Sequence, residues 1–137
     1  MTTMREEERD DLLAEARRAA RRACSPPREA TGALAVTAEG ARIPGTAVRL
    51  EIAAGLSICA EHAALCAARA AGDSPVRLLV LWIPAGAGAH PCGQCLQVWR
   101  ELAPQAPMLF QRGDEEPRIL ELESLLPDAF SHFERGA

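Results

Sequence analysis

Residues 59–61 read Cys-Ala-Glu and residues 91–95 read Pro-Cys-Gly-Gln-Cys, and each stretch stands at the start of a predicted helix. Cys92 and Cys95 are separated by two residues on a first helical turn, so both sulfur atoms can face one point. Cys59 supplies a third sulfur from the other helix. Because a catalytic zinc ion needs three protein ligands and one open position, the two stretches predict a zinc site held by Cys59, Cys92 and Cys95.

Glu61 is the predicted proton carrier of this site. It stands two residues after Cys59, close enough to face a water molecule at the open position without ligating the metal. A carboxyl group there can take a proton from the water and later deliver protons to a ring nitrogen and a leaving amine. The partial positive charge of the two helix N-termini also favours thiolates over thiols. The pattern therefore indicates hydrolytic chemistry with zinc.

A closed structural zinc site, or a set of buried thiols, is the alternative interpretation of the same cysteines. A structural site takes a fourth Cys or His ligand. The two remaining cysteines, Cys24 and Cys66, do not have the spacing for that role. We expect Cys66 to face the core and Cys24 to be partly buried. Disulfides are not expected in a chain without a secretion signal.

The hydrophobic pattern around the two stretches alternates strands with helices. Residues 76–83 form a near-continuous apolar run, which predicts a central strand covered on both faces. Further segments follow the same patterns. Helices are predicted at 6–23, 58–71, 92–102 and 122–126, and strands at 32–37, 42–50 and 108–111, with a turn at Glu39-Gly40. This order predicts one domain, residues 1–137, folded as a three-layer α/β sandwich.

The composition is that of an ordinary globular protein and argues against nucleic acid as a partner. Hydrophobic residues make up 48% and charged residues 25% of the 137 residues, the net charge is -4, and aromatics are only 4%. The arginines at 17–22 form either a nucleic-acid or membrane contact or, as we favour, a solvated face paired with acids such as Glu15. Without a signal peptide or a run of about 20 apolar residues, we expect a cytoplasmic chain with no membrane partner.

The paired motif, Cys59-Ala60-Glu61 followed by Pro91-Cys92-Gly93-Gln94-Cys95, resembles that of the cytidine deaminase superfamily, in particular the small homotetrameric cytidine deaminases and the related blasticidin-S deaminases. Gly32-Ala33, Glu39-Gly40 and residues 125–130 are also similar. The resemblance implies a mixed five-stranded sheet between helices, a Zn²⁺ cofactor, and hydrolytic deamination of an aminopyrimidine nucleoside in pyrimidine salvage. Cytidine or deoxycytidine, converted to uridine or deoxyuridine, is the first expected substrate. The alternatives are another aminated nucleoside, a base or an antibiotic such as blasticidin S, or a non-catalytic binding module stabilised by zinc.

Two replacements in the implied substrate pocket leave the substrate open. Cytidine deaminases usually carry Asn-x-Glu upstream of the first motif, where both side chains hold a ribose hydroxyl, and Arg49 and Glu51 stand there in this chain. Glu51 can still accept a hydrogen bond from a sugar hydroxyl, but a guanidinium only donates and cannot mimic Asn. Arg49 therefore either faces an anionic substrate or pairs with an acid at a sheet edge. Glu29 stands where the family places a Phe that stacks on the pyrimidine, and it is either a pocket residue or a surface residue.

The resemblance also implies roles for residues around the two motifs. His62 stands where the tetrameric enzymes have an Arg that donates toward the thiolates, and it is either a similar donor or an unrelated packed histidine. Ala60 is implied as a substrate contact, Gln97 as a residue behind the metal ligands, and His90 as part of the pocket mouth or of the loop alone. Phe130 matches a Phe that reaches a neighbouring subunit's active site, which implies a homotetramer or homodimer; local packing of the C-terminal segment is the alternative.

Overall fold

The computed structural model describes residues 3–88 and 91–130. Its main elements are α1 (Glu6–Ala20), β1 (Gly32–Thr37), β2 (Arg42–Thr46), α2 (Ala60–Ala71), β3 (Val76–Ile83), α3 (Gly93–Leu102), β4 (Met108–Arg112), β5 (Arg118–Leu120) and α4 (Leu122–Leu125), with short 3-10 turns η1 (Pro27–Glu29) and η2 (Ala54–Leu56). The five strands form one sheet in the order β2-β1-β3-β4-β5. Strands β3 and β4 run parallel, and the other neighbouring strands run antiparallel. The predicted mixed five-stranded sheet is confirmed.

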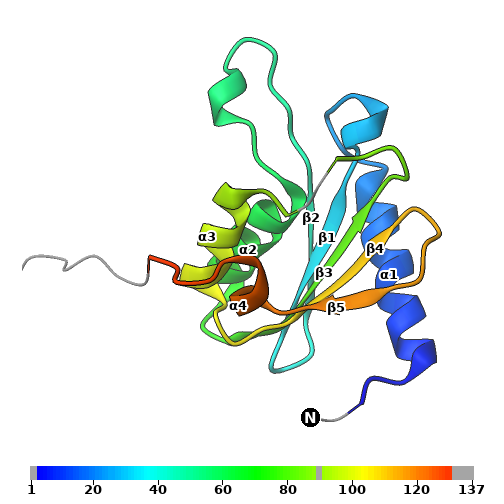
Figure 1. Cartoon of the computed structure of the whole chain (residues 1–137), viewed down its shortest axis with the longest axis vertical. Coiled ribbons are helices and arrows are strands. Elements are labelled where there is room, and N and C mark those ends of the chain that lie inside the picture. Colours follow the sequence, from blue (N-terminus) through cyan, green and yellow to red (C-terminus); the bar gives the residue numbers. More distant parts are fainter. Residues whose placement is uncertain (1–2, 89–90, 131–137) are drawn as a thin grey trace, which may run out of the picture.

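The central strand β3 divides the core into two layers. Leu78, Val80 and Trp82 pack with α1 on one face, whereas Leu79, Leu81 and Ile83 pack with α2 and α3 on the opposite face. This division follows from the alternation of side chains along a strand. Figure 1 shows α1 on one side of the sheet and α2 and α3 on the other. The expected three-layer sandwich, with its apolar strand covered on both faces, is therefore confirmed.

The largest differences from the predicted elements concern β2, α1 and β5, while the other bounds agree within two residues. Strand β2 ends at Thr46 instead of residue 50, because its neighbour β1 begins at Gly32, which pairs with Thr46. Helix α1 ends at Ala20, and residues 21–22 form a turn. Strand β5 was not anticipated from its own residues, since it is three residues long and follows Pro117; pairing with β4 defines it. Such a short edge strand depends on its neighbour more than on its own pattern.

No helix within residues 3–88 and 91–130 combines the length and the apolar composition needed to cross a lipid bilayer. Ion pairs link the charged face of α1 to other parts of the fold. Arg17 pairs with Asp114 at 3.0 Å, and Arg42 of β2 pairs with Glu15 of α1 at 3.1 Å. Glu15 therefore forms an ion pair, as expected, but its partner is Arg42 of β2 and not one of the arginines at 17–22.

Two glycines allow the helices to lie directly against the sheet. A Cβ at Gly45 would meet the Ala60 carbonyl oxygen and the Ala64 nitrogen, which are backbone atoms of α2. A Cβ at Gly32 would meet backbone atoms of α1 in the same way. Helix α2 therefore packs on β2 at a separation that a side chain would prevent. This close contact sets the position of the first turn of α2, which carries Glu61.

The substitution Gly45→Ala is expected to lower the free energy of unfolding by about 1–3 kcal/mol, because backbone atoms of α2 must move to admit the methyl group. Urea unfolding followed by circular dichroism measures the change. Gly55→Ala is the matched control, since a Cβ at Gly55 would meet nothing within 4 Å. Equal stability of the two variants would contradict the role assigned to the close contact of α2 with β2.

Candidate functional site

Three cysteine side chains meet at the starts of two neighbouring helices. Cys59 is the N-cap residue of α2, Cys92 is the N-cap residue of α3, and Cys95 lies in the first turn of α3. Their sulfur atoms all lie within 4.8 Å of one another. The Sγ atoms of Cys59 and Cys92 are 3.9 Å apart, and those of Cys92 and Cys95 are 3.4 Å apart. The structure therefore brings together the three residues that the sequence proposed as one ligand group.

The spacing of this cysteine group suits a tetrahedral zinc ion. Zinc–sulfur bonds of about 2.3 Å at tetrahedral angles place neighbouring sulfurs about 3.8 Å apart. The Cys92–Cys95 and Cys59–Cys92 sulfur separations, 3.4 Å and 3.9 Å, lie on either side of that value. Within residues 3–88 and 91–130 the group contains no fourth His, Cys, Asp or Glu. Three sulfurs with a remaining coordination position are the donor set of a catalytic rather than a structural zinc site.

Hydrogen bonding among the sulfurs concentrates negative charge on Cys59. A hydrogen bond from the Cys95 thiol is the largest cause that lowers the pKa of Cys59 to about 5, against the opposing effect of burial, and Arg49 lowers it further. The same hydrogen bond, together with burial and the nearby Glu61, raises the pKa of Cys95 far above its usual range. Ionisation of Cys95 beside an ionised Cys59 therefore requires a cation among the sulfurs, as binding of a metal ion provides.

Glu61 is a buried carboxyl group next to the cysteine group. It is the second residue of α2, and only 1% of its surface is exposed. Burial raises the pKa of Glu61 to about 7, and the negative charge of Cys59 contributes to the increase. Its Oε1 atom is buried and has no hydrogen-bond partner among the described residues. Because an unpartnered buried oxygen costs stability, a carboxyl group in this state indicates a place for a bound polar molecule.

Arg49 adopts a position that the sequence did not anticipate. Its Nη2 donates to Cys59 Sγ at 3.5 Å, and its Nη1 donates to the backbone carbonyl of Ile58 at 3.0 Å. Its Nε lies 3.8 Å from Oε1 of Glu29. Of the two alternatives left open by the sequence, pairing with a nearby acid is the one observed. The contact with Cys59 is new; the sequence indicated only that some donor toward the thiolates is needed, with His62 as one candidate for it.

The remaining predicted site residues are less closely associated with the cysteine group. Ala60 is fully buried in the first turn of α2. The His62 side chain is half-buried on α2 and forms no hydrogen bond with another side chain or with the backbone in the described part of the chain. Glu51 is exposed in the segment 50–57, which extends away from the sheet in Figure 1. Gln97 donates to the Glu101 carboxylate at 3.1 Å and to the carbonyl of Phe130 at 3.0 Å.

Three further expectations can be compared with the structure. Phe130 is 57% exposed, so burial of its ring in the chain's own core is not observed. Cys24 and Cys66 are both exposed and lie outside the cysteine group, so the expected partial burial of Cys24 is wrong. The expectation that Cys66 faces the core was wrong, because its position on α2 points away from the side that packs on the sheet, where Leu65 and Ala68 are buried. His90 lies outside the described residues.

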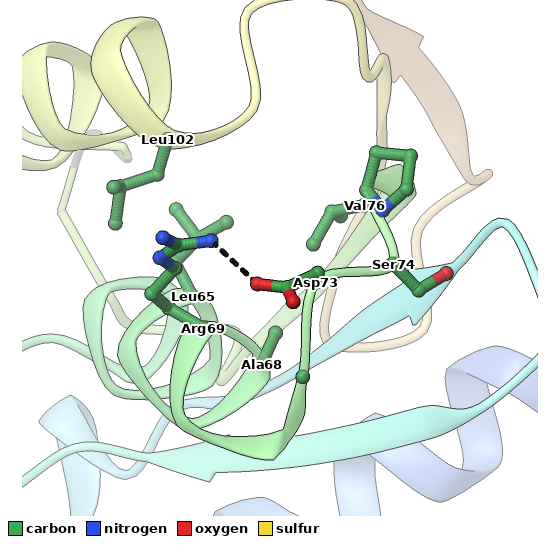
Figure 2. Close-up of a pocket in the computed structure, with 9 residues that line it drawn as sticks. Leu65, Ala68, Arg69, Asp73, Ser74, Val76 and Leu102 are labelled. Atoms are coloured by element: carbon green, nitrogen blue, oxygen red, sulfur yellow. Dashed lines mark ion pairs between the residues drawn. The ribbon is translucent and has the colours of Figure 1, made fainter.

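A separate pocket lies at the opposite end of α2 and does not share the features of the cysteine group. Figure 2 shows this pocket of about 210 Å³, which residues from α2, β3 and α3 line. Its charged residues are Arg69 and Asp73, which form an ion pair of 3.5 Å with side-chain exposures of 71% and 101%. Such an exposed pair contributes little stability and holds no buried charge for a ligand. The candidate functional site is therefore the cysteine group with Glu61.

Comparison with known proteins gives matches over most of the chain. No protein-family model matches it. It is 37% identical over 105 residues to a curated cytidine deaminase of Mycobacterium tuberculosis (strain CDC 1551 / Oshkosh), a match that spans 75% of this chain and 74% of the relative. The fold is similar to a crystal structure of cytidine deaminase from Burkholderia pseudomallei, with a TM-score of 0.79, 31% identity and coverage of 93% of this chain and 100% of that chain. A crystal structure of cytidine deaminase from Mycobacterium tuberculosis gives a TM-score of 0.71, 31% identity and coverages of 88% and 95%.

Proposed function

The chain belongs to the cytidine deaminase family, and from that membership we propose that it hydrolyses cytidine or deoxycytidine to uridine or deoxyuridine with release of ammonia. The observation that carries this function is the buried, unpartnered carboxyl oxygen of Glu61 beside three converging cysteines. A non-catalytic zinc module has no use for such a carboxyl group, since burying an acid beside thiolates is electrostatically unfavourable. An enzyme that transfers protons at this position, in contrast, needs such a carboxyl group.

Cys59, Cys92 and Cys95 would hold a Zn²⁺ ion in this function. Zinc, when bound, acts as a Lewis acid that makes a water molecule reactive near neutral pH. Two of the cysteines are N-cap residues of α2 and α3, and the third lies in the first turn of α3, so the partial positive charges of both helix ends lie close to the three sulfurs. The short connection between Cys92 and Cys95 keeps their sulfurs on one side of α3.

Glu61 moves the protons of the reaction. As a carboxylate, its Oε1 accepts one proton from the attacking water and, as a carboxylic acid, passes that proton to the ring nitrogen; it then takes the remaining hydroxyl proton of the added water and passes it to the amino group, which leaves as ammonia. A pKa of about 7 keeps both forms accessible at neutral pH. Burial also removes competing water from the carboxyl group and keeps it directed into the site. Glu51 remains our predicted acceptor for a sugar hydroxyl.

We also propose that the chain works as a homo-oligomer, most simply a homotetramer. Large apolar side chains are exposed in the segment 50–57 and near the C-terminus, where Ile52 is 102%, Leu56 is 73% and Phe130 is 57% exposed. Exposed apolar groups gathered on projecting segments are typical of subunit interfaces. All five cysteines are free thiols, which suits the reducing cytoplasm in which we place the enzyme and its role in pyrimidine salvage.

A substrate screen tests the proposed function. The purified, zinc-loaded protein is incubated separately with cytidine, deoxycytidine, cytosine and blasticidin S, and ammonia release is measured alongside zinc content. We expect one zinc per chain and turnover of cytidine or deoxycytidine. Turnover of another amine alone would correct the substrate, and zinc binding without any turnover would support the non-catalytic module.

A further inference from the structure

Arg49 is held against the cysteine group by backbone structure on both sides. Val48 and Ile58 exchange two backbone hydrogen bonds, of 3.0 Å and 2.9 Å, so that Arg49 and Cys59 are carried by neighbouring extended segments. The backbone N–H of Arg49 also donates to the Cys24 carbonyl at 2.7 Å. The Arg49 side chain is 23% exposed. Its direction toward Cys59 is therefore built into the fold and is not the chance position of a surface side chain.

The cysteine group needs a positive charge of this kind. Three thiolates outweigh the charge of one Zn²⁺ ion, and the carboxyl group of Glu61 adds to the negative charge nearby. Within the described part of the chain, Arg49 is the cationic side chain with a hydrogen bond to one of the three sulfurs. A hydrogen-bond donor to a ligand sulfur also fixes the orientation of that ligand. Residues that hydrogen-bond to metal ligands affect metal affinity in this way.

We propose that Arg49 is a positioning residue of the metal site, holding Cys59 as a directed thiolate ligand, and that Glu29 in turn holds Arg49. The inference rests on the zinc-binding role proposed above for the three cysteines. It assigns both replacements in the implied substrate pocket to the metal site: the acid at position 29 and the arginine at position 49 form one ion pair that ends at a ligand sulfur.

Binding of an anionic substrate group by Arg49 is the competing role. Each of its three side-chain nitrogens already faces a protein acceptor: the Ile58 carbonyl, Cys59 Sγ or the Glu29 carboxylate. A substrate anion would have to displace Glu29 and would draw the guanidinium away from the ligand sulfur. The geometry thus favours a role toward the metal site over a role toward substrate.

The test measures zinc affinity directly, by competition with a chromophoric chelator, for the wild type and for Arg49→Gln, Arg49→Lys, Glu29→Gln and the Glu29→Gln/Arg49→Gln double variant. Arg69→Gln is the matched control, because it removes an arginine from an exposed ion pair at the far end of α2. Circular dichroism establishes that each variant is folded. The thiolate-to-metal absorption of the cobalt-substituted proteins reports whether Cys59 remains a ligand.

Arg49→Gln is expected to raise the zinc dissociation constant by about 10- to 100-fold and to weaken the cobalt–thiolate absorption. Arg49→Lys, which keeps the charge, is expected to recover part of the loss. Glu29→Gln should cost about two- to fivefold, as for a partly exposed ion pair, and should add nothing in the double variant. Arg69→Gln should bind zinc as the wild type does.

Two results would overturn the inference. Zinc affinity of Arg49→Gln equal to that of the wild type, with a raised KM for the substrate, would make Arg49 a substrate-binding residue and leave the proposed function intact. Absence of zinc binding by the wild type itself would overturn the proposed function and this inference together. The two failures are distinguished by the wild-type measurement alone.

Discussion

Replacement of Glu61 by Gln is expected to reduce the rate of ammonia release by about 10²- to 10⁴-fold while zinc stays bound. The amide fills the same volume in the buried site but cannot take a proton from water or return it to the substrate. Glu61 is not one of the three residues whose sulfurs converge, so the ligand group is unchanged. Ammonia release from cytidine and zinc content by atomic absorption are measured on the same preparation.

Glu39→Gln is the matched control for this experiment, because it removes a carboxylate from the exposed turn between β1 and β2. It should retain wild-type activity. Thermal unfolding followed by circular dichroism establishes that the Glu61 variant is folded, as expected for a substitution of equal volume. Turnover by folded Glu61→Gln at the wild-type rate would show that another group carries the protons.

Replacement of Cys95 by Ser is expected to abolish stable zinc binding and, with it, activity. Cys95 is the most buried of the three cysteines, at 2% exposure, and its sulfur lies 3.4 Å from that of Cys92. Two sulfurs alone do not make the three-ligand set of a catalytic zinc site. Loss of a residue that only hydrogen-bonds to a metal ligand already costs about 10- to 100-fold in metal affinity or activity. We therefore expect loss of the ligand Cys95 to lower zinc affinity by more than about a hundredfold.

Cys66→Ser provides the matched control for the loss of a thiol. Cys66 lies on α2 like Glu61, but it is exposed and outside the cysteine group. Zinc per chain is determined after gel filtration, and ammonia release is assayed with and without added zinc. We expect Cys66→Ser to keep both properties. A Cys95→Ser protein that retains a full complement of zinc would contradict the assignment of ligands.

Local patterns were sufficient to predict most elements of this fold. The bounds predicted for β1, at 32–37, and for β3, at 76–83, are those observed. Each strand is defined by apolar side chains that are close in sequence, so the information lies within the element itself. Local spacing also predicted that Cys92 and Cys95 share one side of a helix, whereas their meeting with Cys59, on another helix, was predicted from the paired motif and its resemblance to cytidine deaminases.

Features that depend on two distant segments were not predictable in this way. Strand β2 ends where its partner begins, at the pairing of Thr46 with Gly32, and β5 is defined by its pairing with β4. Side-chain exposure is also a property of the assembled layers. The helix pattern predicted that Cys66 faces the core, whereas in the folded chain Cys66 is exposed on α2.

Arg49 shows most clearly what the assembled fold adds. Composition and spacing indicate that three thiolates need a nearby cation, but they do not say which one supplies it. Which residue supplies the cation depends on three segments that meet at one place: η1, the segment after β2, and the start of α2. Glu29, Arg49 and Cys59 become neighbours there. The chemistry of the site follows from residue types within short motifs. The partner that balances its charge follows from contacts between segments far apart in sequence, which only tertiary packing brings within bonding distance.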